Sequence, residues 1–247
     1  MTASAPRADL RQHAPAGVLR PGIRTYKPRR TRMTERQRAA LERRGDLILA
    51  VDSGCFDLAD IWGAGTPVVL EIGFGDGAAT AAMASADPGT GVLAVDVHTP
   101  GVGELLARLD ERGLTNVRVM EADALGVLSR SIPAASLQTV RSYFPDPWPK
   151  ARHHKRRLIQ PEVLDLVRSR LVEGGTWHLA TDWDEYAQTL EGHFAVDPHW
   201  TGGRIPSPAW RPETRYERRA RRDGRPIADL MFRTTMAQEP TSHRPGG

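Results

Sequence analysis

Short apolar segments alternate with helical segments along the middle of the chain, and this alternation sets the fold class. The expected strands cover residues 68–72, 92–95, 117–121, 137–144, 177–180 and 228–234. The expected helices between them cover residues 78–86, 103–112 and 161–171. A helix that follows each strand returns the chain to the same edge, so successive strands lie parallel. The sequence therefore predicts an α/β fold, a doubly wound and mostly parallel sheet with helices on both faces.

The two ends of the chain and one internal segment lack this pattern. Residues 1–45 form a basic arm that is expected to be disordered over residues 1–22, with a capped helix start at residues 34–37. One domain is expected over residues 46–236, and a disordered tail over residues 237–247. Within the domain, residues 198–213 are rich in Pro, Gly and Trp, which indicates a structured loop.

Composition excludes several classes of protein. No apolar run approaches the length of a membrane-spanning helix, and no apolar segment follows the basic N-terminus, so neither a membrane protein nor a secretory signal is predicted. The lone cysteine, Cys55, fits the reducing cytosol and predicts a cytoplasmic protein. The eight histidines have no spacing typical of metal ligands, so no metal is expected.

Positive charge is concentrated in three segments. Residues 1–45, 141–158 and 204–225 carry net charges of +9, +5 and +5, so the rest of a chain with net charge +4 carries −15. One basic run alone would most simply be a solvated face. Three of them on an acidic body indicate a surface that binds phosphates, with nucleic acid as the partner.

A glycine-rich turn lies between the first expected strand and the helix that follows it. Gly73, Gly75 and Gly77 alternate with other residues there, in the context that a nucleotide-binding turn requires. Nicotinamide, flavin and S-adenosylmethionine (AdoMet) sites all use such a turn, and so does a tight turn with no ligand. The turn alone does not separate these alternatives.

Three acidic residues at the strand ends favour AdoMet. Glu71 lies inside the first strand, where a carboxylate requires a partner, while Asp96 and Asp123 end the next two strands. Repeated acids would repel the pyrophosphate of a dinucleotide. AdoMet carries a sulfonium and an ammonium but no phosphate. Each acid alone could be a helix cap or a loop residue, but their shared register indicates a binding site.

A proline-locked carboxylate follows the fourth strand. Asp146 stands between two prolines in the sequence Phe-Pro-Asp-Pro-Trp, which predicts a stiff, extended backbone just past a strand end. Ligands bind at that edge of open α/β sheets. Trp148 could be a stacking platform for a base or a lid of the core, and both readings stay open. His153 and His154 are expected to be surface residues.

Two later segments are also candidates. Asp182 follows the fifth strand, where it could equally be a helix cap. Residues 214–217 lie in the last basic segment, where an ordinary exposed turn explains them as well. Propensity alone does not decide either case.

Several of these motifs are similar to those of one family. The glycine turn, residues 97–103, the segment from Phe144 to Arg157, residues 180–183 and Thr214-Arg215-Tyr216-Glu217 resemble the bacterial tRNA (guanine-N7-)-methyltransferases, over roughly residues 22–232. The resemblance implies a seven-stranded, Rossmann-like class I methyltransferase domain over residues 46–236. It also implies transfer of a methyl group from AdoMet to N7 of a guanine in the variable loop of tRNA, by a monomer or weak homodimer.

The resemblance also implies roles for individual residues. Asp146 would be the catalytic residue. AdoMet would contact Glu71, Gly73, Gly75, Asp96, Asp123 and Asp146. The tRNA would contact Lys150, Arg152, His153, Lys155, Arg156, Arg157, Asp182, Thr214, Arg215, Tyr216 and Glu217. Asp96 stands where the family usually has glutamate, which shortens the expected ribose contact by one methylene.

Two alternatives remain at this point. A methyltransferase that acts on another RNA would use the same residues. A non-catalytic RNA-binding protein on the same fold would be expected to lose the glycine turn or the strand-end acids, and both are present.

Overall fold

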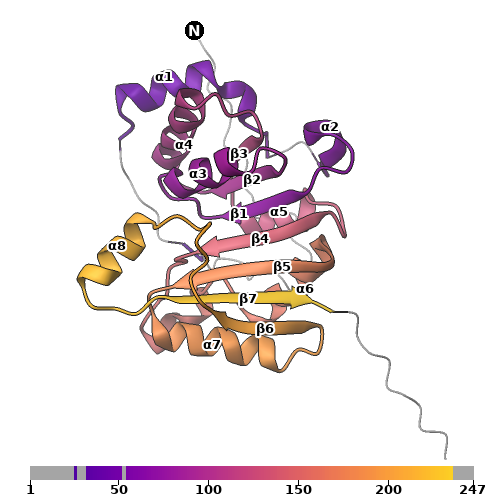
Figure 1. Cartoon of the computed structure of the whole chain (residues 1–247), viewed down its shortest axis with the longest axis vertical. Coiled ribbons are helices and arrows are strands. Elements are labelled where there is room, and N and C mark those ends of the chain that lie inside the picture. The colour runs from indigo at the N-terminus through magenta and orange to yellow at the C-terminus, as the bar shows by residue number, and fades with distance from the viewer. Residues whose placement is uncertain (1–24, 27–31, 52–53, 236–247) are drawn as a thin grey trace, which may run out of the picture.

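The computed structural model describes residues 25–26, 32–51 and 54–235, which form one mostly parallel sheet flanked by helices (Figure 1). The strands are β1 Val68–Ile72, β2 Gly91–Asp96, β3 Val117–Glu121, β4 Leu137–Tyr143, β5 Leu171–Thr181, β6 Trp200–Ile205 and β7 Ala228–Thr234. Within the described residues the sheet has seven strands in the order β3-β2-β1-β4-β5-β7-β6. The strand β7 runs antiparallel to both of its neighbours, β5 and β6, and the other neighbouring strands among the described residues are parallel. The predicted doubly wound, mostly parallel sheet is confirmed.

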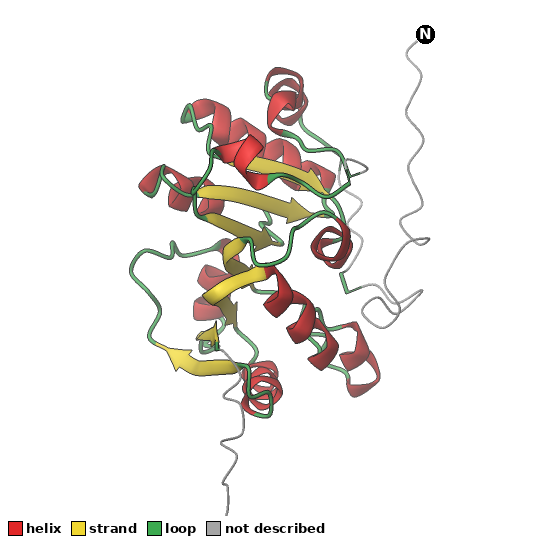
Figure 2. Ribbon diagram, turned by 90° about the vertical axis from the view of Figure 1, so that its right-hand side faces the viewer, coloured by secondary structure: helices red, strands yellow, loops and turns green. Residues whose placement is uncertain are grey.

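Helices cover both faces of the sheet (Figure 2). They are α1 Glu35–Arg43, α2 Leu58–Trp62, α3 Ala78–Ala86, α4 Thr99–Glu111, α5 Ala124–Arg130, α6 Pro161–Arg170, α7 Asp184–Ala195 and α8 Arg215–Arg222, with 3-10 turns η1 Gly45–Leu47 and η2 Ala151–Arg156. Alternate residues of β2 enter opposite cores. Val92 belongs to the core that includes residues of α1, α3 and α4, and Leu93 belongs to the core that includes residues of α5, α6 and α7. A strand buried on both faces is mostly apolar, which is why β1 and β2 were recognisable despite Glu71 and Asp96.

Two predicted helix boundaries differ from the structure. The helix predicted from residue 103 starts at Thr99, because Pro100 occupies the first turn, where a missing N–H costs no hydrogen bond. The ranges predicted for the next helix, 161–171, and for the fifth strand, 177–180, leave a gap that holds Gly174 and Gly175. Instead α6 ends at Arg170 and β5 begins at once, with the glycines inside a register shift relative to β4. Gly174 has a φ of +69°, which the irregular strand requires.

The loop predicted over residues 198–213 was wrong in part, because it contains the edge strand β6. Gly202 lies so close to β7 that a Cβ there would stand 2.1 Å from the carbonyl oxygen of Met231. Glycine is therefore required for the close approach of the two backbones. Because glycine has no side chain, this strand does not show the alternation of apolar residues by which strands are predicted.

The described part of the N-terminal arm is attached to the domain. The predicted helix start is confirmed: Thr34 and Gln37 form a reciprocal capping box at α1. Arg36 then donates to Glu104 at 2.8 Å and to Glu111 at 2.7 Å, both on α4. Residues 1–24 and 236–247, which include the predicted disordered segments, lie outside the described residues. The division into arm, domain and tail stays a prediction.

Two further findings concern the described residues as a group. None of their helices is long and apolar enough to cross a membrane. Among them no three His, Cys, Asp or Glu side chains gather in a way that could hold a metal ion.

Candidate functional site

A cavity lies at the carboxyl ends of β1, β2, β3 and β4. The chain leaves β1 in one direction toward β2 and β3 and returns on its other side as β4, so the loops after β1 and β4 separate and leave a crevice. The cavity is open to solvent on one side, and the space within it, open solvent included, amounts to about 960 Å³. Three carboxylates line it, those of Asp96, Asp123 and Asp146, and no Lys or Arg is among its described lining residues.

The glycine turn forms one wall of this cavity. Gly77 has a φ of +67° and caps α3, and a Cβ there would stand 2.7 Å from the side chain of Leu105. Left-handed geometry and close packing both require glycine at this position. The amide of Gly75 points to the next strand end and donates to Asp96 Oδ2 at 3.0 Å. The turn and the strand-end acid are thus held as one unit.

Asp96 and Asp123 are tied to backbone amides at the edge of the cavity. Asp96 Oδ1 accepts from the amide of His98 at 3.1 Å, and Asp123 Oδ1 accepts from Leu125 at 3.0 Å as the cap of α5. Burial raises the pKa of both carboxyls, and the backbone hydrogen bonds oppose this only in part. Asp123 therefore caps α5 and also lines the cavity, and its predicted contact with AdoMet stays a prediction.

Glu71 lies in an adjoining lobe rather than in the main cavity. This lobe shares Gly73, Gly75 and Tyr216 with the main cavity. The Glu71 side chain is buried, and its Oε1 accepts from Thr80 Oγ1 at 3.0 Å, whereas Oε2 is buried with no hydrogen-bond partner. Burial raises the pKa of Glu71, and the nearby Arg141 opposes that rise. An unpaired buried carboxylate oxygen in a cavity suits a cationic ligand.

The segment around Asp146 is stiff but not simply extended, as had been expected. Phe144 and Trp148, on either side of it, have φ values of +53° and +43°. Non-glycine residues rarely adopt this left-handed conformation, which costs energy and is concentrated at functional sites. The Phe144 amide donates to Ala180 O at 2.7 Å, which fixes the start of the segment to β5. Asp146 lines the main cavity.

Trp148 is a lid of the core rather than a platform open to a base. Its side chain is buried, and its indole N–H donates to Thr25 O at 3.3 Å. The Arg156 guanidinium lies 5.0 Å from the ring centroid, and the His153 ring contacts it edge-on. These contacts decide between the two readings that the sequence left open.

The cations that follow form an exposed group, with one exception. We call Lys150, Arg152, Lys155 and Arg156 the basic turn, because they lie in and beside η2 and all four are exposed. His153 and His154 are partly exposed in the same turn.

Arg157 was predicted to contact RNA, but the structure buries its side chain. Its side chain is 1% exposed, forms an ion pair with Glu185 and lies 4.7 Å from the ring centroid of Tyr186. Its Nε also donates to Pro147 O at 2.9 Å, so it braces the segment that carries Asp146. Arg157 is a buried structural cation.

The later predicted residues divide in the same way. Tyr216 lines the cavity and stacks on Phe144 with ring centroids 6.3 Å apart, and Arg215 is exposed beside it. Thr214 caps α8, and its Oγ1 accepts from the amide of Glu217 at 3.1 Å. Glu217 was predicted to contact the substrate, but its side chain is only 3% exposed and forms ion pairs with Arg211 and Arg221.

Asp182 lies outside the lining of both cavity lobes. It is partly exposed and pairs with Arg225 at 3.0 Å. The helix cap suggested for Asp182 is not formed: Trp183 precedes α7 instead, and Thr181 Oγ1 accepts from its amide.

Two residues of the cavity had no sequence signal. Thr25 and Tyr26 line it from the N-terminal arm, more than 40 residues before the glycine turn. They carry neither a motif nor a charge, and their place follows from the folded structure, where Thr25 O accepts from the Trp148 indole.

The geometry and the comparisons with known proteins agree on a class. The sheet order with a reversed β7, the glycine turn and the strand-end carboxylates define a class I methyltransferase fold. A family model described as a putative methyltransferase matches residues 65–230. A tRNA (guanine-N(7)-)-methyltransferase of Streptomyces avermitilis is 47% identical over 95% of this chain and 81% of its own length. One of Halorhodospira halophila is 45% identical over 85% and 94%. The chain belongs to the family of tRNA (guanine-N(7)-)-methyltransferases.

Solved structures support the fold alone. The 16S rRNA methyltransferase KamB is 18% identical, with a TM-score of 0.53 over 73% of this chain and 95% of that one. A 16S rRNA (adenine(1408)-N(1))-methyltransferase from Catenulisporales acidiphilia, solved with its cosubstrate SAM, has a TM-score of 0.51 over 78% and 95% at 15% identity.

Proposed function

We propose that this protein transfers the methyl group of AdoMet to N7 of a guanine in the variable loop of tRNA, in the cytoplasm. The observation that carries the proposal is the position of the Asp146 segment. On one side Asp146 lines an anionic cavity, and a few residues later the chain forms the exposed basic turn. The segment thus joins a site for a cationic methyl donor to a surface for a polyanion. The names of the relatives support N7 of guanine as the acceptor.

The cavity fits AdoMet by charge. The described lining of its main part supplies carboxylates and no Lys or Arg, and Arg215 and Arg218 line only the adjoining lobe. The pyrophosphate of a dinucleotide would need cationic or amide donors in the main part. Asp96 would accept from the ribose hydroxyls and Asp123 from the adenine amine. Glu71, with its unpaired oxygen, would hold the ammonium group. When bound, AdoMet supplies a methyl group made electrophilic by the sulfonium.

The acceptor atom determines what Asp146 must do. Guanine N7 has an in-plane lone pair and no proton to remove before attack, so a general base is not required. Positive charge grows on the purine as the methyl group arrives. A carboxylate at ~4 Å with an effective dielectric constant of ~20 stabilises that charge by about 4 kcal/mol, a ceiling near three decades in rate. The rest must come from alignment of the reacting atoms, which the braced Asp146 segment provides.

The substrate surface follows from exposure. The basic turn would bind tRNA phosphates, because the side chains of its four cations are exposed to solvent. The target guanine would leave its tertiary pairing to reach the cavity. Tyr216 is one of the aromatic residues that line the cavity and would stack on the guanine there, whereas Trp148 is buried.

Replacing Glu71 by glutamine is expected to stabilise the ligand-free protein by ~1 kcal/mol at pH 7 while weakening AdoMet binding. Because the folded pKa of Glu71 is raised, the charged carboxylate opposes folding at neutral pH. That penalty is present above the folded pKa and disappears as the pH falls toward the ordinary value of 4.5. Thermal melting from pH 4 to pH 8 and calorimetric titration with AdoMet measure the two effects. A gain in stability that persists unchanged at pH 4 would contradict this account.

Replacing Gly101 by alanine is expected to weaken AdoMet binding about tenfold. A Cβ on Gly101 would stand 2.4 Å from the carbonyl oxygen of Gly75, so the glycine turn must move. Gly192→Ala is the matched control, because that residue lies inside α7 with nothing within 4 Å of its added Cβ. The control should stabilise the protein by ~1 kcal/mol and bind AdoMet normally. Equal affinities in both variants would show that the turn is not part of the site.

The proposed function is tested by three measurements on the full chain. Calorimetry measures AdoMet binding, radiolabelled methyl groups measure transfer to bulk tRNA, and mapping of the modified base identifies the acceptor. Methyl incorporation that resists RNase would point to another substrate. Binding of tRNA without methyl transfer would support the rival function, a non-catalytic RNA-binding protein. Light scattering tests whether the protein is a monomer or a weak homodimer.

A further inference from the structure

Buried polar side chains form a continuous network from the sheet to α8. Tyr143 Oη lies 2.9 Å from His178 Nδ1, and His178 Nε2 lies 2.9 Å from Asp229 Oδ1. Arg211 donates through Nε and Nη2 to the two oxygens of Asp229, at 2.7 and 2.8 Å. It also donates through Nη1 to Glu217 Oε2 at 2.7 Å. The network thus connects three strands, the loop before α8 and α8 itself.

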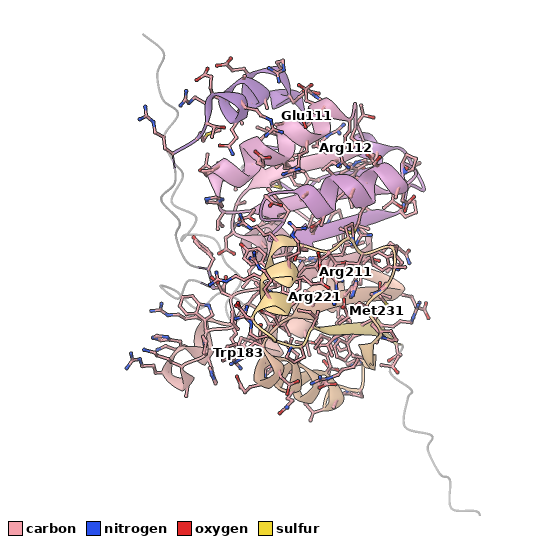
Figure 3. The ribbon with its side chains drawn as sticks, turned by 60° about the vertical axis from the view of Figure 1, so that its left-hand side comes forward. Glu111, Arg112, Trp183, Arg211, Arg221 and Met231 are labelled. Carbon is pink, nitrogen blue, oxygen red and sulfur yellow. The ribbon has the colours of Figure 1, made fainter. Side chains whose placement is uncertain are left out.

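Arg211 is the centre of this network. Its side chain is 1% exposed, like those of its two carboxylate partners, Asp229 and Glu217, at 0% and 3%. Burial would raise the pKa of Asp229, but hydrogen bonds from His178, Arg211 and Ser207 lower it to about 2. Arg221 pairs with the second oxygen of Glu217 at 2.8 Å from the exposed side of α8 (Figure 3). Only a planar guanidinium can reach both carboxylates with three N–H groups at once.

Both ends of the network reach the cavity. Tyr143 lines its main part and the adjoining lobe. At the other end, the residue directly before Glu217 is Tyr216. Its ring packs on Phe144 and lies over the glycine turn. A Cβ on Gly75 would stand 3.7 Å from that ring. The ring therefore closes the space between the glycine turn and the segment that carries Asp146.

We propose that Arg211 is a positioning residue of the methyl-transfer site, which holds α8 against the sheet so that Tyr216 closes the AdoMet cavity. Arg211 lines neither lobe of the cavity and so acts through α8 rather than by contact with ligand. A folded protein without this linkage would still present the glycine turn and the strand-end acids. It would lack the wall that Tyr216 forms. The inference rests on the proposed binding of AdoMet.

The test compares Arg211→Lys, Tyr216→Ala and the double variant in the full chain. Lysine keeps the charge but cannot hold both carboxylates. We expect each single variant to raise the KM and Kd for AdoMet about tenfold, and Arg211→Lys, which touches no ligand, to change kcat less than about twofold. The double variant should bind no more weakly than Tyr216→Ala, because Arg211 acts through Tyr216. Arg204→Lys is the matched control, since Arg204 also pairs with two acids, Asp184 and Glu191, but is exposed.

Hydrogen exchange provides a measurement that needs no ligand. Arg211→Lys should speed amide exchange in α8 while leaving β1 and β2 protected. If that variant does not fold, Glu217→Gln weakens the same linkage with little change of shape, and the same results are expected from it.

Three results would overturn the inference. One is normal AdoMet affinity in a variant whose α8 exchanges faster, and another is unchanged exchange in α8. The third is a double variant whose loss equals the sum of the two single losses. In all three cases the unmodified protein still binds AdoMet, so the proposed function survives. If the unmodified protein fails to bind AdoMet, the proposed function falls and the inference falls with it.

Discussion

Replacing Asp146 by alanine is expected to abolish methylation of tRNA, with kcat reduced by about three decades and tRNA affinity changed less than about twofold. The carboxylate lies at the edge of the cavity on a segment fixed by Phe144 and braced by Arg157. In the proposed mechanism, removing it takes away the group that would stabilise charge on the purine, but none of the exposed cations. Single-turnover methylation and filter binding of tRNA measure the two quantities separately.

Two further variants sharpen this experiment. Asp146→Asn keeps the shape and hydrogen-bonding capacity but not the charge, so a loss as large as that of alanine identifies charge as the contribution of Asp146. Asp165→Ala is the matched control, because Asp165 is an exposed aspartate on α6. Near-normal turnover in Asp146→Ala would overturn the catalytic role.

Neutralising the basic turn is expected to weaken tRNA binding by about 10- to 100-fold at ~0.1 M salt. Each lost phosphate contact also removes ~0.7–0.9 from the slope of log affinity against log salt concentration. The fourfold alanine variant of Lys150, Arg152, Lys155 and Arg156 should therefore reduce that slope by about 3. Titrations of labelled tRNA between 50 and 300 mM salt, roughly the range in which such slopes are measured, supply both values.

Arg157 is the internal comparison for this experiment. It adjoins the basic turn in sequence, but it is buried against Glu185 and Tyr186. Arg157→Met should leave the salt slope unchanged and lower the thermal stability. A reduced slope in Arg157→Met, or an unreduced one in the fourfold variant, would place the tRNA on a different surface.

What the sequence could predict depended on whether a pattern was local. The strands β1 and β2 are buried on both faces and apolar except for Glu71 and Asp96, and they were recognised. The edge strand β6 was missed, because Gly202 has no side chain that could contribute to an apolar pattern. Glycine is needed there because the backbone of β7 lies too close for a Cβ. The glycine turn, Asp96 and Asp123 converge because parallel strands end at one edge, which the strand order guarantees.

Other features depend on contacts between distant residues. Arg156 and Arg157 are identical in sequence terms, yet one is exposed and the other has 1% exposure, because only the second faces Glu185. Tyr216 and Glu217 are neighbours on α8 that point to different surroundings, the cavity and the buried Arg211. No local pattern encodes such partners, since they lie elsewhere in the chain.

The unpaired oxygen of Glu71 also makes the stability of the folded protein depend on the concentration of AdoMet. A folded chain that concentrates buried carboxylates around a cavity becomes more stable when a cationic ligand binds there. Since a ligand at 100 times its Kd adds ~2.7 kcal/mol to the unfolding free energy, the amount of folded enzyme would follow the supply of methyl donor. Cells short of AdoMet would then lose this protein to unfolding and proteolysis before they lost its activity to lack of substrate.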